Sequence, residues 1–206
     1  MNNFDFDLKY YEKGISLLAG VDEAGRGPLA GPVVAAAVIF EKGKYIEGIK
    51  DSKKLTEKKR EELFEQILTE ALAVEVAIIE VKEIEKLNIL NAALKAMKTA
   101  VEKLNPKPEF ILIDGNKKFT TNIPAESIVK GDAKSFVIGA ASIVAKVTRD
   151  RIMRELDKRF PEYYWAKNKG YGTKQHIEAI KKYGVTEHHR KLFLRKIFPS
   201  DEPAFL

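Results

Sequence analysis

The sequence predicts an α/β fold, in which a mixed β-sheet is covered by helices. Short apolar, β-branched runs occur in turn with segments whose apolar residues recur at helical spacing, as expected for such a fold. With 206 residues the chain can bury one substantial core. It is 45% hydrophobic and 32% charged, and no apolar run reaches the roughly 18 residues of a membrane span. These values are typical of a soluble globular protein.

Two predicted strands border a glycine-rich loop near the N-terminus. Residues 15–21 and 33–40 are too short and too β-branched to favour helix. Asp22 and Glu23 stand where the first of these strands is expected to end. Residues 24–32 contain three glycines, which permit positive φ and close backbone approach, and two prolines, which exclude helix. We expect this loop to bind a ligand.

A helix, a strand and a second helix are predicted next. Thr56 is the expected N-cap of a helix that packs on the sheet through apolar residues at helical spacing, namely Leu63, Phe64, Ile67, Leu68 and Leu72. Residues 74–81 form the third predicted strand. The apolar positions between 90 and 104 predict a second helix, ended by Asn105-Pro106.

Two further strands and a long helix complete the core. Residues 110–113 are an apolar run ending in Asp114, the pattern of a central parallel strand that delivers a polar group at its C-terminal end. Residues 127–130 predict a shorter strand, followed by Asp132. A long helix is predicted from about residue 134 to Arg159, where Pro161 ends it. We therefore expect an α/β catalytic core over residues 1–160 and a basic helical extension over 161–206 that contributes to substrate binding.

The net charge of +6 is concentrated near the C-terminus. Between Tyr163 and Phe198 nine Lys and Arg stand against two Glu, and aromatic residues are interspersed among the lysines. This pattern favours a polyanion such as nucleic acid as the partner, although a solvated helical face is an alternative. All three histidines lie in this segment, isolated or adjacent, which is not the pattern of a metal site. The absence of cysteine suits the cytoplasm, where we place the protein.

Four acids follow three separate apolar strands: Asp22, Glu23, Asp114 and Asp132. Clustered carboxylates repel one another unless a cation lies between them. All-oxygen ligation favours Mg²⁺ or Mn²⁺ over Zn²⁺. Two such ions could activate a water and stabilise the leaving oxygen in phosphodiester cleavage.

Simpler interpretations of the same acids remain open. Asp114-Gly115-Asn116 alone is typical of a turn, and Asp132 alone could cap the following helix. Asp22 and Glu23 have no local partner, but neighbours on a regular strand point to opposite faces. Both reach one site only if the strand bends or Glu23 contributes its backbone carbonyl. The glycine patterns match neither a dinucleotide fingerprint nor a P-loop, so nucleoside triphosphate binding is disfavoured.

Several motifs occur together in the order found in one known family. They are Val21-Asp22-Glu23-Ala24-Gly25-Arg26-Gly27-Pro28, Asp51-Ser52-Lys53-Lys54-Leu55, Ile113-Asp114-Gly115-Asn116, Lys130-Gly131-Asp132, the segment Ala140 to Asp150, and Gly170-Tyr171-Gly172-Thr173. From Gly20 to about Phe193 the chain resembles ribonuclease HII, the prokaryotic type 2 ribonuclease H. One departure is Leu192, where the family often has serine.

The resemblance implies a ribonuclease H-like fold with a five-stranded mixed sheet flanked by helices. It also implies that Asp22, Glu23, Asp114 and Asp132 are the catalytic residues and hold the metal, which is expected to be two ions of Mg²⁺ or Mn²⁺. By the same resemblance, Gly25, Arg26 and Gly27 read the 2′-hydroxyl at an RNA–DNA junction, Tyr171 packs on the next deoxyribose, Lys53 binds a phosphate, and Asn116, Lys134, Ser135, His176 and Arg190 lie on the substrate side.

The activity implied is that of an endonuclease that cuts the RNA strand of RNA/DNA hybrids. It also cuts 5′ of single ribonucleotides embedded in duplex DNA, leaving 3′-hydroxyl and 5′-phosphate ends, as ribonucleotide and primer removal require. We expect a monomer whose partners are these nucleic acids, with no membrane association. The alternatives are ribonuclease HIII or a junction resolvase of the same fold, or a hybrid-binding module without catalysis.

Overall fold

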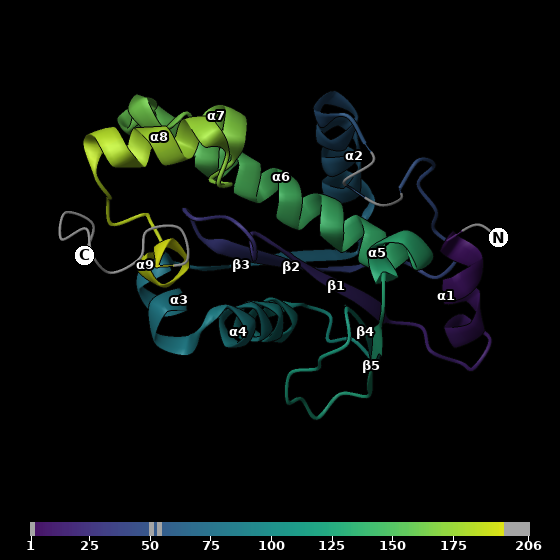
Figure 1. Ribbon diagram of the computed structural model, residues 1–206. Helices are drawn as coiled ribbons and strands as arrows, with labels where there is room; N and C mark the ends of the chain where they lie inside the picture. The colour runs from purple at the N-terminus through teal and green to yellow at the C-terminus, as the bar shows by residue number, and fades with distance from the viewer. Residues whose placement is uncertain (1–2, 50–51, 53–54, 196–206) are drawn as a thin grey trace.

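The structure is a computed structural model that describes residues 3–49, 52 and 55–195. Its centre is a five-stranded sheet in the order β3-β2-β1-β4-β5 (Figure 1). The strands are β1 (Leu18–Ala24), β2 (Val33–Ile39), β3 (Ala73–Ile79), β4 (Phe110–Asp114) and β5 (Ala125–Ile128). β2 runs antiparallel to β1 and β3, whereas β1, β4 and β5 are parallel. The predicted mixed sheet is confirmed.

Helices cover both faces of the sheet. They are α1 (Asn3–Tyr11), α2 (Glu57–Glu70), α3 (Val81–Leu87), α4 (Ile89–Lys103), α5 (Gly131–Lys134), α6 (Phe136–Arg159), α7 (Trp165–Asn168), α8 (Lys174–Tyr183) and α9 (Lys191–Leu194). The long helix α6 lies across β1 and β2 on one face, and α4 lies on the other (Figure 1). No helix in the described ranges has the length and apolar character needed to cross a membrane.

The two faces of the sheet bury separate apolar clusters. Every residue of β2 is buried, because helices cover it on both sides. Alternate residues of β1 divide between the clusters: Leu18 packs on the α6 side, and Ala19 and Val21 pack on the α4 side. A third, smaller cluster around Trp165 lies beneath the C-terminal helices. This cluster joins those helices to the loop that follows β1.

Gly20 sets the distance between β1 and α6. A Cβ atom on Gly20 would lie 2.1 Å from the backbone carbon of Val137, far inside van der Waals contact. Only glycine therefore allows the helix to approach the strand this closely. This contact lies two residues before Asp22, so it fixes the height of α6 above the acidic end of β1.

Several predicted boundaries differ from the structure. β1 continues through Ala24, beyond its predicted end, because Asp22 and Glu23 are still paired with β2. β5 begins and ends two residues before its predicted range. Leu68 on α2 is exposed rather than packed on the sheet, since α2 contacts α6 with only part of its apolar face, and Leu72 is exposed in the segment after α2. Thr56 caps α2 as predicted, accepting a hydrogen bond from Lys59 N at 3.2 Å.

Candidate active site

Asp22 lies on the side of β1 that faces α6. Its side chain is 4% exposed and accepts a hydrogen bond from the Glu23 N–H at 2.7 Å. The Ser142 side chain, on α6, also hydrogen-bonds to the carboxyl group. Burial raises the pKa of Asp22 well above its ordinary value, and repulsion from Glu23 and Asp114 adds to the increase. Asp22 is therefore a buried carboxyl in the field of two other acids.

Glu23 is the next residue along the strand and is partly buried. Its Oε1 is 3.1 Å from Nη1 of Arg26, whose side chain is half exposed. Burial raises the pKa of Glu23, and so does repulsion from Asp114, whereas Arg26 lowers it. A regular strand would turn Asp22 and Glu23 to opposite faces, yet both residues line one cavity.

Asp114 and Asp132 meet at the C-terminal ends of β4 and β5. Oδ1 of Asp114 accepts hydrogen bonds from the backbone N–H groups of Gly131 at 2.6 Å and Asp132 at 3.3 Å. Asp132 is 6% exposed and belongs to α5, while Ser135 caps the long helix instead. Within the described ranges, no group of three or more His, Cys, Asp or Glu side chains is drawn together closely enough to hold a metal ion as it stands.

A cavity of about 240 Å³ joins Asp22 and Glu23 to the glycine-rich loop, whereas Asp114 and Asp132 do not line it. Its lining comprises Asp22, Glu23, Ala24, Gly25, Arg26, Gly27, Ser52, Ser142, Lys146, Arg149 and Tyr171. The Tyr171 ring is 47% exposed, and its Cε1 lies 3.4 Å from the point that a Cβ of Gly27 would occupy. The cavity thus brings together residues from β1, α6 and the segment between α7 and α8.

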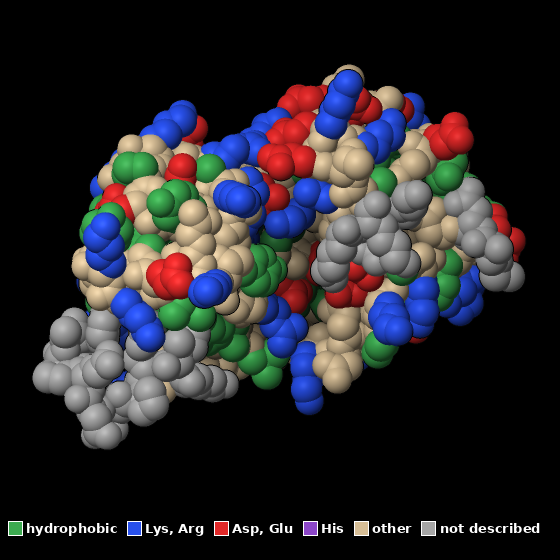
Figure 2. Space-filling view, turned by 45° about the horizontal axis from the view of Figure 1, so that its top comes forward, with side chains coloured by type: hydrophobic (Ala, Val, Ile, Leu, Met, Phe, Trp, Pro, Cys, Tyr) green, Lys and Arg blue, Asp and Glu red, His purple; other side chains and the backbone are tan. Residues whose placement is uncertain are grey.

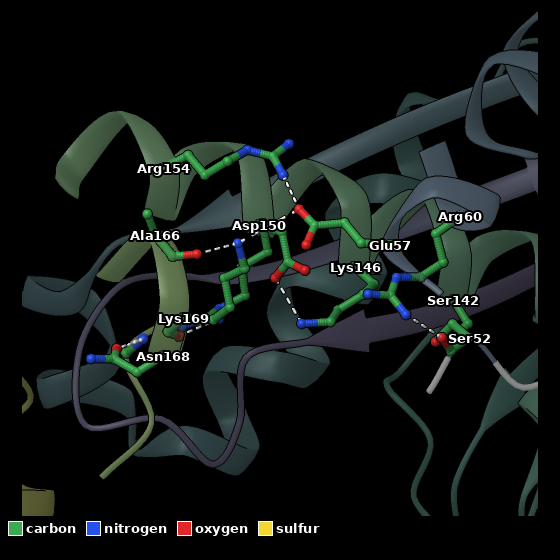
Figure 3. A network of polar contacts seen from close by, with 12 residues as sticks. Ser52, Glu57, Arg60, Ser142, Lys146, Asp150, Arg154, Ala166, Asn168 and Lys169 are labelled. Atoms are coloured by element: carbon green, nitrogen blue, oxygen red, sulfur yellow. Dashed lines mark hydrogen bonds and ion pairs between the residues drawn. The ribbon is translucent and has the colours of Figure 1, made fainter. Parts of the chain in front are cut away.

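The part of the lining that sequence reasoning missed belongs to a polar network (Figure 3). Ser52 Oγ and Ser142 Oγ lie 2.9 Å apart, and Lys146 Nζ lies 2.7 Å from Asp150 Oδ1. Burial lowers the pKa of Lys146, although Asp150 opposes this. Lys146 and Asp150 are four residues apart in the α6 motif, a spacing that places two side chains on one helix face and could have revealed the pair.

Two buried arginines hold the loop from within. Arg149 donates hydrogen bonds to the carbonyls of Ala30, Pro32 and Lys169, at 2.9 to 3.0 Å. Burial lowers the pKa of Arg149 to about 10 and that of Arg190 to about 9. The loop therefore owes its shape to two guanidinium groups.

The resemblance places Arg190 on the substrate side, but in the structure its side chain lies inside the protein. Its guanidinium is fully buried and donates hydrogen bonds to the backbone carbonyls of Arg26, Pro28, Gly31 and Pro32, at 2.7 to 3.3 Å. Those contacts leave it pointing into the protein, where it supports the loop from the inner side. The carbonyls need a donor there because the two prolines and the glycines of the loop form no regular backbone pairing.

Ser135 and His176 are also buried, contrary to expectation. Ser135 Oγ accepts a hydrogen bond from Ile138 N at 3.3 Å and so caps α6. His176 contacts Trp165 and the Tyr171 carbonyl rather than the surface. In contrast, Asn116 and Lys134 are exposed, and Lys53 lies outside the described residues.

The molecular surface is hollowed where the cavity opens. Figure 2 shows acidic side chains inside this hollow and Lys and Arg side chains along its edges. Cationic edges attract the phosphates of a nucleic acid, while the acidic interior repels them unless cations intervene. The surface therefore has a charge pattern that fits a nucleic acid held at its backbone.

The fold and site define a nuclease with the ribonuclease H-like fold. Ribonuclease H2 from Pyrococcus horikoshii OT3 aligns with a TM-score of 0.74 at 31% identity, covering 88% of this chain and 96% of that structure. The chain belongs to the ribonuclease HII family, whose family model matches residues 19–198. Ribonuclease HII of Acetivibrio thermocellus is 57% identical over 190 residues, which are 92% of this chain and 74% of the relative.

Family membership decides between the alternatives raised by the sequence. Bst-RNase HIII, solved in complex with Mn²⁺, aligns with a TM-score of 0.68 but at only 18% identity, covering 90% of this chain and 67% of that one. That likeness concerns the fold alone. The chain is therefore an endonuclease of the ribonuclease HII type, which hydrolyses RNA in RNA/DNA hybrids, and neither a ribonuclease HIII nor a non-catalytic binding module.

Proposed function

We propose that this endonuclease depends on divalent metal and also cuts 5′ of single ribonucleotides embedded in duplex DNA, leaving 3′-hydroxyl and 5′-phosphate ends. The observation that carries the proposal is the shared cavity, in which Asp22 and Glu23 lie beside Arg26, Gly27 and Tyr171. Two of the four acids proposed to bind metal thus line one small space with residues able to inspect a sugar. The reaction serves ribonucleotide removal and primer removal.

The acids Asp22, Glu23, Asp114 and Asp132 are proposed to be catalytic and to hold Mg²⁺ or Mn²⁺ as a pair of ions. Burial raises the pKa of Asp22 and Glu23, repulsion from Asp114 adds to the increase at both, and a bound cation would relieve that repulsion. Carboxylate oxygens without sulfur ligands fit a hard cation. When bound, such ions supply activation of the attacking water and neutralisation of charge on the leaving oxygen.

The loop residues Gly25, Arg26 and Gly27 are proposed to read the 2′-hydroxyl at the junction. Gly27 has no Cβ, and the Tyr171 ring stands just beyond the point where one would lie. The Gly27 backbone is therefore open to a sugar that lies beside the ring. The ring is proposed to pack on the following deoxyribose, where a second 2′-hydroxyl would collide with it.

Exposed polar residues are proposed to contact the flanking phosphates. Asn116 and Lys134 are exposed in the segments that carry the acids, and Lys53 belongs to the same proposal through the motif it occupies. The basic helices after residue 160 are proposed to add affinity for the duplex. We further propose that the protein acts as a monomer in the cytoplasm.

The test is a metal titration of cleavage on a DNA duplex with one internal ribonucleotide. Mg²⁺ or Mn²⁺ should restore 5′ incision to metal-free protein, and Asp114→Asn should lower kcat by at least about 100-fold while hybrid binding persists. Glu126→Gln is the matched control and should cut normally, because Glu126 is an exposed acid on β5 that accepts a hydrogen bond from the Tyr10 hydroxyl. Metal-independent incision, or normal turnover by Asp114→Asn, would refute the proposal.

A further inference from the structure

Two buried histidines connect the C-terminal helices to Tyr171. His176 lies in the first turn of α8 and is fully buried, and His189, between α8 and α9, is 2% exposed. Their Nε2 atoms are 3.2 Å apart. A neutral imidazole has one nitrogen that donates and one that accepts, so this contact requires a proton on only one of the two Nε2 atoms.

The surrounding contacts decide which nitrogens carry the protons. Thr186 N–H donates to His189 Nδ1 at 2.9 Å, so the His189 proton lies on Nε2 and points at His176. His176 Nε2 must then accept, and it also accepts from Trp165 Nε1–H at 3.0 Å. The His176 proton therefore lies on Nδ1, which donates to the Tyr171 carbonyl at 2.9 Å. A directed chain runs from Thr186 to Tyr171 with one tautomer for each ring.

The environment keeps both rings neutral. Burial lowers the pKa of His176, and burial together with repulsion from the other histidines lowers the pKa of His189 to about 3. A second proton on either ring would turn an acceptor nitrogen into a donor facing another donor. The chain of hydrogen bonds is therefore intact at neutral pH.

The segment that carries His189 also pairs with the glycine-rich loop through its backbone. Gly31 N–H donates to the His188 carbonyl at 2.8 Å, and Arg190 N–H donates to the Leu29 carbonyl at 2.7 Å. The segment around His189 thus binds the glycine-rich loop through its own main chain. Through the His189 side chain and His176, the same segment also supports the Tyr171 carbonyl. The two walls of the cavity share a single support.

We propose that His176 and His189 are positioning residues that set the place of Tyr171 relative to Gly27 and thereby the discrimination between one ribonucleotide and a run of them. The inference rests on the proposed function, in which the Tyr171 ring packs on the sugar after the ribonucleotide. Neither imidazole reaches the cavity, so both act through Tyr171. Loss of the Nδ1–H contact leaves the carbonyl to the Thr173 N–H, which donates to it at 2.8 Å, and removes the buried ring that fixes where Tyr171 stands.

The test compares His176→Leu with His176→Asn. Both remove the acceptor for Trp165 and His189, but the asparagine amide can still donate to the Tyr171 carbonyl from the position of Nδ1. The measurement is the ratio of kcat/KM on a one-ribonucleotide duplex to kcat/KM on a uniform RNA/DNA hybrid. The leucine variant should lower this ratio about tenfold and the asparagine variant by less than about twofold. Equal ratios in the two variants, despite equal loss of melting temperature, would overturn the inference.

Tyr171→Ala separates this inference from the proposed function. If Tyr171→Ala lowers the ratio and His176→Leu does not, only the positioning role fails; if Tyr171→Ala leaves the ratio unchanged, the proposed reading of the sugar fails as well. In the Tyr171→Ala background, His176→Leu should have no further effect on the ratio. A measurement without variants uses the ¹⁵N shifts of the wild-type imidazoles. Nδ1–H on His176 and Nε2–H on His189 at pH 7 support the chain, and any other tautomer pair overturns it.

Discussion

At the scale of single residues, Asp7 shows how burial and a helix terminus compete. Its side chain is fully buried, and Oδ2 accepts a hydrogen bond from Val137 N at 3.0 Å at the start of α6. The helix N-terminus favours the ionised form, but desolvation outweighs it and raises the pKa of Asp7 to about 6. Between about pH 4 and pH 6 the folded protein therefore binds a proton that the unfolded chain has released.

This proton gives a signed prediction for stability. Because the folded state binds more protons in that range, the free energy of unfolding should fall as the pH rises from about 4 to 6, by up to about 3 kcal/mol from this group. Asp7→Asn removes the titration. Urea unfolding of both proteins at pH 4.5 and pH 7 should show a smaller decrease for the variant, and parallel curves would contradict the prediction.

Residue types alone could indicate which side chains gather at the acidic cavity but not which ones are buried behind it. Asp22 and Glu23 follow an apolar run, which placed them at the end of a strand before any contact was known. The resemblance placed Ser135, His176 and Arg190 on the substrate side. In the structure all three are buried: Ser135 caps α6, His176 hydrogen-bonds to His189, and Arg190 hydrogen-bonds to the loop carbonyls. A serine, histidine or arginine suits either role, and only tertiary contacts decide between them.

At the scale of elements, the close contact between β1 and α6 depends on the absence of a side chain at Gly20. Gly20→Ala would force a Cβ into the Val137 backbone, which cannot yield as a flexible side chain would. We expect a loss of about 3 kcal/mol in the free energy of unfolding, since overpacking against backbone requires the helix to move.

The matched control for this variant is Gly43→Ala. Gly43 has a φ of +88°, and no atom lies within 4 Å of the position that a Cβ would occupy there. Its substitution therefore tests backbone strain alone and should cost about 1 kcal/mol. Chemical denaturation gives both values. Equal losses of unfolding free energy in the two variants would show that the contact between β1 and α6 tolerates a methyl group at position 20.

The length of β1 shows why local sequence misjudges an element. The acids suggested an end at Val21, but Asp22 and Glu23 face Ala36 and Ala35 of β2 across a continuous antiparallel ladder. Pairing with a neighbour strand outweighed local polarity. The seven-residue helix α3 had no distinct signal either, because its start, Val81, reads as a continuation of the strand before it.

At the scale of the whole molecule, the basic charge near the C-terminus makes binding depend on salt. Lys174, Lys181 and Lys182 are exposed on α8, which lies on the α6 side of the sheet (Figure 1). Changing all three to Gln should flatten the plot of log affinity for an RNA/DNA hybrid against log salt, by about one unit for each lysine that meets a phosphate.

Three lysines of α4, on the opposite layer, provide the control for charge alone: Lys95, Lys98 and Lys103. Their replacement by Gln changes the net charge equally but should leave the slope nearly unchanged, because phosphates that follow the cavity do not reach that layer. Fluorescence anisotropy across a salt series measures both slopes. Equal flattening would mean that net charge, and not the face of α8, attracts the hybrid.

The overall architecture was accessible in part from patterns of residues. Apolar runs and helical spacing indicated a mixed sheet between helices, as found. The strand order β3-β2-β1-β4-β5 could not be predicted from these patterns, because pairing between distant strands leaves no local signature. The five-stranded ribonuclease H-like arrangement was predicted from the resemblance alone.

Arg190 hydrogen-bonds to the Arg26 carbonyl from inside the protein, and this contact determines which backbone group the loop presents to solvent. A trans peptide unit is planar, so a carbonyl turned toward the interior turns the amide hydrogen of the next residue, Gly27, the other way. At this peptide unit the main chain then presents an N–H donor to solvent and not a carbonyl acceptor. In the proposed function, a sugar bound at the loop would therefore face an N–H donor whose direction Arg190 fixes from the interior without contacting the sugar.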